Sequence, residues 1–124
     1  MADQAGNLAL LERFIAAWGR RDADAVVACL APNATYAASV GPEPGATYVG
    51  RTAIRAGVAK MFAHDADSEM STDRPAMMGD IAVLTWTYRS RTPTGTVRAV
   101  RGCDIFVFEA GEIVLKDAFR KTEA

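Results

Sequence analysis

Two aspartates near the end of the chain are the residues best placed to do chemistry. Asp104 lies in the apolar segment 102–108, and Asp117 lies in the segment 112–121. Each segment predicts a strand, and the sequence between them, 109–112, predicts a tight turn around a glycine. Because strand side chains alternate between two faces, Asp104 is expected to share its face with Phe106 and Phe108. By the same rule Asp117 is expected to share its face with Ile113, Leu115 and Phe119.

A carboxylate among apolar side chains is costly unless it is paired, hydrogen-bonded or protonated. Burial raises the pKa of a carboxyl group, so such an acid can give or take a proton near neutral pH. We therefore predict Asp104 and Asp117 as catalytic acid/base groups if both enter one cavity. In the structural alternative, Asp104 accepts a hydrogen bond from a tyrosine hydroxyl or a backbone amide. In that alternative Asp117 pairs with Arg89, Arg101 or Lys116, or lies exposed near a strand end.

Aromatic side chains are the expected walls of a ligand site. Small-molecule sites are mostly apolar with a few convergent polar groups, and tyrosine hydroxyls can donate hydrogen bonds to a ligand. The same residues can equally be core. The single histidine, His64, is catalytic only if it lies near Asp104 or Asp117, and otherwise is a solvated loop residue. The predicted ligand-binding residues are Phe14, Trp18, Tyr36, Trp86, Tyr88 and Phe106.

Composition narrows the class of protein. The chain has 124 residues, 50% of them hydrophobic, and a net charge of −1, which favours one globular domain without a nucleic-acid partner. No apolar run approaches the roughly 20 residues of a membrane span. The first seven residues lack the features of a secretory signal, so a cytoplasmic protein is expected.

Cofactor motifs are not visible in the sequence. Cys29 and Cys103 lie far apart, which is typical of small buried thiols rather than of a zinc or redox motif. One histidine excludes a multi-histidine metal site. Without a nucleotide-binding loop, a metal set or a flavin motif, we expect neither a cofactor nor a metal.

Helices are expected first and strands afterwards. The apolar spacing predicts a helix over 5–19. A second helix, capped by Asp22, is expected to end at Pro32, and Thr52 is expected to cap a third, after a loop over 41–47. The order predicts an α+β fold in which a curved sheet wraps over its helices. Expected strands cover 35–38, a weak segment over 70–78 that Pro75 breaks or places at an edge, 81–91, 96–108 and 112–121.

With these elements in this order, four segments carry a family resemblance that spans almost the whole chain. The sequence resembles the nuclear transport factor 2-like superfamily, in its SnoaL-like and ketosteroid isomerase-like branch. The segments are Arg13-Phe14-Ile15-Ala16-Ala17-Trp18 with Asp22, Leu30-Ala31-Pro32-Asn33-Ala34-Thr35-Tyr36, Gly50-Arg51-Thr52-Ala53-Ile54-Arg55, and Asp104-Ile105-Phe106-Val107-Phe108 with Gly111-Glu112-Ile113.

The resemblance implies a single SnoaL-like domain over residues 1–124. It implies three N-terminal helices packed in the concave face of a highly curved, mostly antiparallel sheet, a cystatin-like cone. It also implies a mainly apolar pocket and a homodimer packed through the outer face of the sheet.

The chain departs from the ketosteroid isomerase pattern that it resembles. In that pattern an aspartate base moves a proton while a tyrosine and a neutral aspartic acid stabilise the oxyanion. Asp104 falls on the neutral acid, but Phe14 occupies the place of the tyrosine, and Ala38 lies where the base would be. Steroid isomerisation by that mechanism is therefore not expected.

Two other branches resemble the chain at Asp117. Epoxide hydrolases use an Asp-Arg-Asp set, of which Asp117 and Arg89 match two members while the third acid is missing. SnoaL-like cyclases use a late-strand aspartate, usually with a histidine nearby, for which His64 is the one candidate. The resemblance thus implies a cofactor-independent isomerase, cyclase or hydratase/hydrolase that acts on a compact apolar or cyclic metabolite. The alternative is a non-catalytic ligand-binding or dimerisation module of the same fold.

Overall fold

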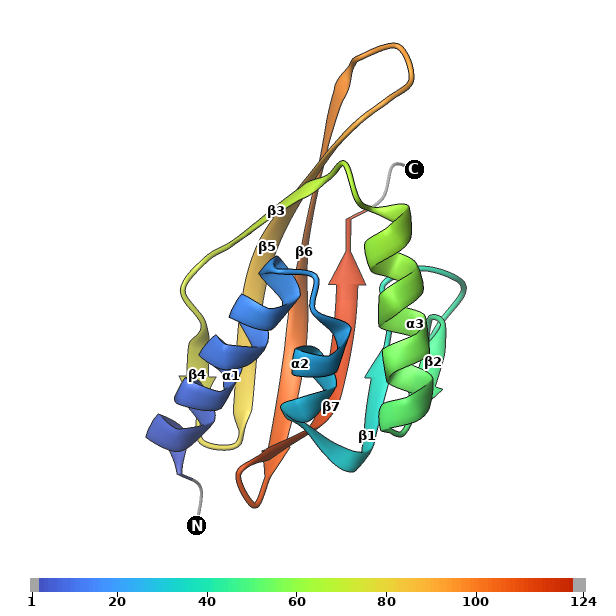
Figure 1. Cartoon of the computed structure of the whole chain (residues 1–124). Coiled ribbons are helices and arrows are strands. Elements are labelled where there is room, and N and C mark those ends of the chain that lie inside the picture. Colours follow the sequence, from blue (N-terminus) through green and yellow to red (C-terminus); the bar gives the residue numbers. More distant parts are fainter. Residues whose placement is uncertain (1–2, 122–124) are drawn as a thin grey trace.

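In the part of the chain that the structure describes, three helices cover one face of one curved sheet (Figure 1). The structure is a computed structural model that describes residues 3–121. The helices are α1 (Gln4–Gly19), α2 (Ala23–Ala28) and α3 (Arg51–His64). The strands are β1 (Leu30–Ala37), β2 (Thr47–Val49), β3 (Glu69–Thr72), β4 (Ala76–Met78), β5 (Ile81–Arg91), β6 (Val97–Glu109) and β7 (Glu112–Arg120).

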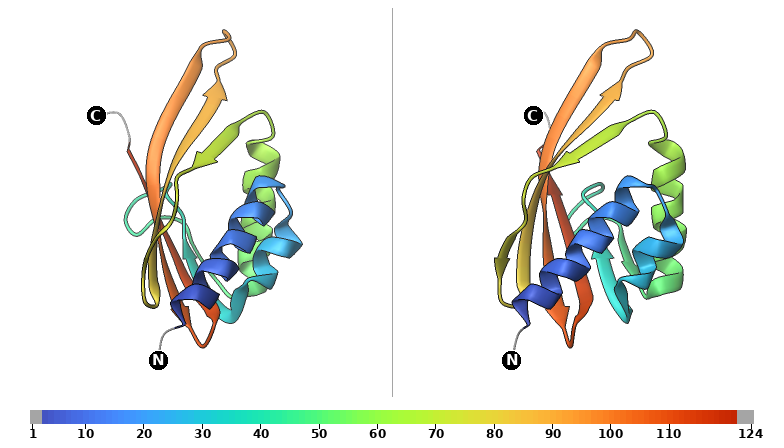
Figure 2. Two further views of the ribbon diagram at one scale, coloured as in Figure 1. Left: turned by 90° about the vertical axis from the view of Figure 1, so that its left-hand side faces the viewer. Right: turned by 60° about the vertical axis from the view of Figure 1, so that its left-hand side comes forward.

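The sheet runs in the order β2-β1-β7-β6-β5-β3, and β4 pairs with β5 beside β3. The first and last strands, β1 and β7, pair in parallel, and every other pair in the described part of the chain is antiparallel. Seen from the side, the helices lie on the concave side of the curled sheet, and the β5–β6 hairpin projects beyond them (Figure 2). The predicted α+β fold class is confirmed.

Among residues 3–121, aspartate side chains cap the N-termini of α1 and α2, whereas no side chain caps α3. Asp22 caps α2 as predicted, because its Oδ1 accepts a hydrogen bond of 3.1 Å from the backbone N–H of Ala25. The predicted cap of α3 by Thr52 is wrong. That helix begins at Arg51 after Gly50, whose φ of 87° favours glycine, and no side chain caps it.

The first strand is longer than the sequence predicts. α2 ends at Ala28, and Pro32 lies inside β1 rather than stopping the helix. The register between β1 and β7 shifts between Leu30 and Thr35, and such an irregularity tolerates a proline that cannot donate to the ladder. The loop expected over 41–47 ends in a strand that the sequence does not predict. This strand, β2, forms by pairing with residues 35–37 of β1. Residues 73–75 separate β3 from β4, so the predicted break near Pro75 is confirmed.

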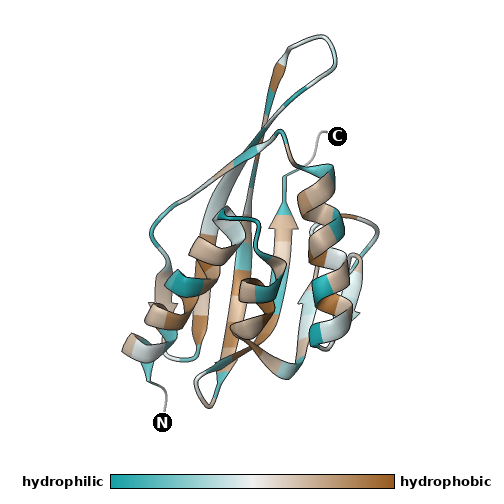
Figure 3. Ribbon diagram, viewed as in Figure 1, coloured by the Kyte–Doolittle hydropathy of each residue, from teal (hydrophilic) through white to brown (hydrophobic). Residues whose placement is uncertain are grey.

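The long strands have one buried and one exposed face. On β5, Ala82, Leu84 and Trp86 are buried and alternate with the exposed Ile81 and Val83. Apolar residues concentrate in the helices and in the lower part of the sheet that they cover, whereas the hairpin tip is more polar (Figure 3). Within residues 3–121 no helix is long and apolar enough to cross a membrane.

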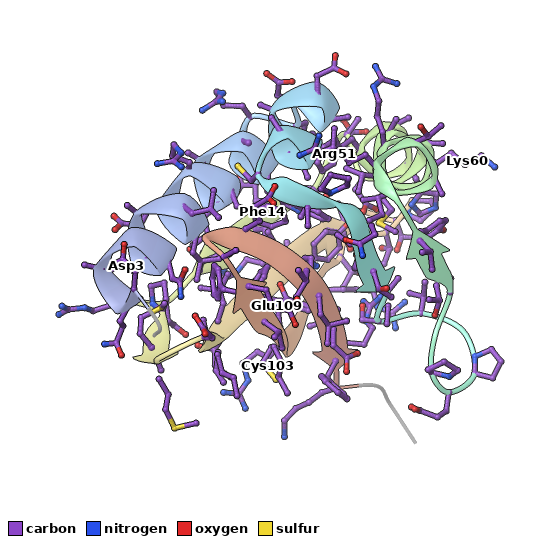
Figure 4. All side chains as sticks on the ribbon, turned by 90° about the horizontal axis from the view of Figure 1, so that it is seen from below. Asp3, Phe14, Arg51, Lys60, Cys103 and Glu109 are labelled. Carbon is purple, nitrogen blue, oxygen red and sulfur yellow. The ribbon has the colours of Figure 1, made fainter. Side chains whose placement is uncertain are left out.

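The view from below separates the two faces of the sheet. Phe14 lies between the helices and the sheet, whereas Cys103 lies on the side of the sheet away from the helices (Figure 4). Both cysteines are free thiols, and Cys29 is the buried one. Cys103 is opposite Phe119 in the β6–β7 register, which places Phe119 on the same outer face. We call this side the convex face and the helix-covered side the concave face.

Candidate functional site

A cavity of about 780 Å³ lies between the helices and the concave face of the sheet. This volume falls within the range of small-molecule sites, roughly 300–1,000 Å³. Helices α1 and α3, the loop after β1 and strands β1, β3, β5, β6 and β7 all contribute side chains to its wall. The aromatic residues of the wall are Phe14, Trp18, Tyr36, Tyr48, Phe62, Trp86 and Tyr88.

A buried ion pair forms part of this wall. The Nζ atom of Lys116 lies 3.4 Å from Oδ2 of Asp104, and each residue is only 6% exposed. The indole Nε1–H of Trp86 donates a 3.1 Å hydrogen bond to Oδ1 of the same carboxylate. Both oxygens of Asp104 therefore have a partner, as a buried charge requires. The predicted face of Asp104, shared with Phe106 and Phe108, is confirmed.

The ammonium of Lys116 also lies against two aromatic rings. Its Nζ is 4.2 Å from the ring centre of Tyr36 and 4.6 Å from that of Trp18, which is cation–π geometry. Tyr36 is in register with Lys116 across the parallel β1–β7 pair, which places the ring beside the lysine. Trp18 comes from the last turn of α1.

The charge state of Lys116 follows from these neighbours. Burial acts to lower the pKa of the ammonium, but the attraction of Asp104 and the interactions with Tyr36 outweigh burial and raise the pKa above its ordinary value. Lys116 is therefore a positively charged donor at neutral pH rather than a free amine. That state suits electrostatic stabilisation and hydrogen bonding, and does not suit nucleophilic attack.

Gly102 determines how Trp86 reaches the carboxylate. The two residues face each other across β5 and β6, and Asp104 lies two residues further along the same face. A Cβ atom at Gly102 would overlap Cζ2 of Trp86 and the carbonyl oxygen of Phe119. The absence of a side chain therefore lets the indole lie across β6 with its N–H directed at Asp104.

A β-bulge in β7 decides which charged residues reach the cavity. Phe108 pairs with Ile113, but Val107 pairs with Leu115, so Val114 is an extra residue in β7. Beyond the bulge the strand's faces are exchanged. Lys116, Ala118 and Arg120 line the cavity, whereas Asp117 is not among its lining residues.

The predicted face of Asp117 is therefore wrong. The prediction assumed unbroken alternation from Ile113, which holds only as far as the bulge. Asp117 is opposite Ile105 on the convex face, half-buried and apart from Asp104, so the two aspartates do not enter one cavity. Lys116 was missed as a cavity residue. The sequence carries one hint of the bulge, the uninterrupted apolar run Ile113-Val114-Leu115, but this run does not determine which of the later side chains face the interior.

The predicted aromatic residues mostly meet at the cavity. Phe14, Trp18, Tyr36, Trp86 and Tyr88 line it, and their role in ligand binding stays a prediction. Phe106 does not line it. That ring is fully buried in the core, 5.4 Å from Phe14 in an edge-to-face contact.

Polar groups gather near the outer end of α3. His64 is the last residue of α3, and its side chain is 88% exposed and hydrogen-bonded to Asp65 at 2.9 Å. Both residues border the cavity. Burial and the nearby Asp65 raise the pKa of the Tyr88 hydroxyl, so Tyr88 is a neutral hydrogen-bonding group. Among residues 3–121 no cluster of three or more histidine, cysteine or acidic side chains could hold a metal ion.

Comparison with known proteins agrees with this architecture. Residues 11–116 match the family model of the SnoaL-like domain, and the chain belongs to this family. No curated protein gives a match to the sequence.

Solved structures share the fold at low sequence identity. A nuclear transport factor 2-like protein of unknown function from Mesorhizobium loti is 21% identical, with a TM-score of 0.81 over 96% of this chain and 93% of that chain. A cystatin-fold protein from Novosphingobium aromaticivorans is 19% identical, with a TM-score of 0.76 over 92% and 97%. SalBIII, an epoxide hydrolase/cyclase-like enzyme with a role in pyran ring formation in the polyether salinomycin, is 19% identical, with a TM-score of 0.80 over 98% and 95%. These similarities define the fold and leave the chemistry to the site.

Proposed function

We propose that the protein binds a compact apolar or cyclic metabolite in this cavity and catalyses a cofactor-independent proton transfer. The reaction class is isomerisation, cyclisation or addition of water. The observation that carries the proposal is the buried pair of Asp104 and Lys116, which lines an aromatic cavity large enough for a small molecule. Buried, strongly interacting titratable groups beside a cavity are candidates for such chemistry.

The pair offers the two groups that proton transfer next to a carbonyl requires. A base must take the proton from carbon, and a donor must stabilise the negative charge that develops on oxygen. The Asp104 carboxylate is the proposed base. Lys116 is the proposed donor, because its ammonium is held in the charged state and lies beside the same cavity. Asp117, on the convex face, has no part in this scheme.

Membership of the SnoaL-like family supports this reaction class. The fold neighbour SalBIII is described as an epoxide hydrolase/cyclase-like enzyme, so the same architecture serves ring-forming chemistry in that protein. Because the sequence identity to SalBIII is low, no residue role is transferred from that protein to this chain.

A second candidate is a non-catalytic ligand-binding module. Asp104 and Lys116 neutralise each other's charge in the ion pair. The carboxylate of Asp117 lies on the convex face and does not add a second acid to the pair. A structural ion pair would have the same geometry. In this case the cavity would bind the same kind of molecule without changing it.

We also propose a homodimer packed through the convex face. Large apolar side chains are exposed there, including Phe119 at 44%, with Ile81 and Val83 close to 40%. Exposed apolar side chains gathered on one face support the proposal, because association through that face would remove them from water.

Exchange of carbon-bound hydrogen for deuterium tests the catalytic proposal without knowledge of the substrate. Isomerisation and aldol-type cyclisation both begin with removal of a proton next to a carbonyl. We therefore expect the protein to accelerate exchange in D₂O on members of a panel of cyclic ketones such as 1-tetralone and 2-tetralone, followed by proton NMR.

Two variants distinguish the candidates. Asp104→Asn should abolish the accelerated exchange, whereas the matched control Asp117→Asn, on the convex face, should retain it. Ketones that raise the melting temperature without any exchange would favour the non-catalytic module. Exchange that survives in Asp104→Asn would rule out Asp104 as the base.

A further inference from the structure

The concave face of β7 carries two positive residues separated by a small one. Lys116, Ala118 and Arg120 alternate along the strand, and all three line the cavity. Two strand positions four residues apart lie about 13 Å from each other, so the two cations border different parts of the same cavity. Ala118 leaves room between them for the body of a ligand.

The cavity is positive although the chain is not. Among residues 3–121, five positive side chains and three carboxylates line it, which gives a net charge of +2 with His64 neutral, against −1 for the whole chain. The positive residues are Arg21, Lys60, Arg91, Lys116 and Arg120, and the carboxylates are Asp65, Asp67 and Asp104. A concave site with an excess of positive charge attracts negatively charged ligands.

These charges are not equally available. Lys116 is matched by Asp104. Arg120 is half-buried and lines the cavity, and no carboxylate among residues 3–121 lies within ion-pair distance of it. A guanidinium in this position can form two parallel hydrogen bonds to a carboxylate.

We infer that the ligand is an organic anion, an aromatic or alicyclic carboxylate whose charged end binds Arg120. Its apolar body then lies over Ala118 against the aromatic wall, and its far end reaches the pair of Lys116 and Asp104. The inference rests on the proposed function, since it names the class of molecule for the same cavity.

The bulge at Val114 is what gives the cavity this charge. Without the extra residue, strict alternation would place Asp117 on the concave face and Arg120 on the convex face. The cavity would then have a second carboxylate in place of a guanidinium. The anion preference is therefore a property of this chain's register and not of the fold alone.

Two probes of the same shape test the inference. 2-Naphthoate carries a carboxylate, and 2-naphthamide is its neutral counterpart. By isothermal titration calorimetry at low salt we expect the wild-type protein to bind naphthoate about tenfold more tightly, the value of one charge-assisted hydrogen bond. Added potassium chloride should weaken binding of naphthoate and leave that of naphthamide unchanged.

Variants locate the source of the preference. Arg120→Gln should remove the tenfold preference without weakening naphthamide, whereas Lys121→Gln, the exposed next residue with the same charge, should retain it. Equal binding of both probes by the wild-type protein would overturn the inference and leave the proposed cavity function standing. Binding of neither probe would also overturn it, while the deuterium-exchange assay tests the proposed function separately. Should Arg120→Gln fail to fold, the salt dependence of naphthoate binding to the wild-type protein tests the same inference, and binding that salt does not weaken would overturn it.

Discussion

Replacing Lys116 by methionine isolates the energetics on which the site depends. The substitution removes the ammonium but keeps most of the side-chain length, so the apolar contacts with Trp18 and Tyr36 remain in part. The carboxylate of Asp104 stays buried and keeps the hydrogen bond from the Trp86 N–H. The folded state must then hold a charge that has lost its counter-ion.

The expected loss is large for a single substitution. Breaking a buried ion pair by removing one partner costs about 3–5 kcal/mol, because the other charge is left uncompensated. This loss of about 3–5 kcal/mol already includes the loss of the cation–π contacts, which are worth about 0.5–2 kcal/mol. A domain of this kind has a free energy of unfolding of about 5–15 kcal/mol, so Lys116→Met should remove roughly a third to a half of a mid-range value of about 10 kcal/mol.

A second variant distinguishes the charge from the packing. Lys116→Met combined with Asp104→Asn leaves no buried charge and keeps an acceptor for the Trp86 N–H. The double variant should therefore be more stable than Lys116→Met alone by about 2 kcal/mol or more.

Urea unfolding followed by tryptophan fluorescence measures these differences as changes in midpoint at constant slope. Lys121→Met, at an exposed site, is the matched control and should change stability by less than about 0.5 kcal/mol. A loss below about 1 kcal/mol in Lys116→Met, or a double variant no more stable than the single one, would show that the pair is not buried as described.

The same contacts lead to three more expectations. The pKa of Lys116 in the folded protein is raised above its ordinary 10.5, so the ion pair contributes its full stability below pH 10.5. As the pH rises above 10.5 this stability is lost. The urea midpoint of the wild-type protein should then fall more steeply than that of the variant lacking both charges. Gly102→Ala should lower stability by about 1–3 kcal/mol and shift the fluorescence of Trp86, since the new methyl group would overlap the indole; unchanged fluorescence would contradict that contact. Phe119→Glu should convert the proposed dimer into a 13.2 kDa monomer in sedimentation velocity, and a wild-type protein already monomeric at micromolar concentration would refute the dimer.

Local pattern was enough to predict most elements of the fold. The alternation of β5 and the capping of α2 by Asp22 depend on neighbours within a few residues, and the structure confirms both. The same alternation also predicted that the side chain of Asp104 lies on the buried face of its strand, which is the concave face of the sheet. β2 was missed because three residues next to a glycine- and proline-rich loop carry too little pattern, and only pairing with β1 makes them a strand.

The site itself depended on register, which a strand's own sequence does not fix. The sequence of segment 112–121 is compatible with either Asp117 or Lys116 on the interior face of the strand. A single extra residue in the strand determines which of the two faces the interior. That choice is made by the pairing of β7 with β6 on one side and β1 on the other, where Val114 is left without a partner in the β6 ladder. The sequence by itself therefore determined the helices, the main strands and a buried acid at Asp104. Tertiary structure alone decided that a lysine, and not a second aspartate, lies beside that acid, because strand pairing and not residue type sets which face of β7 turns inward.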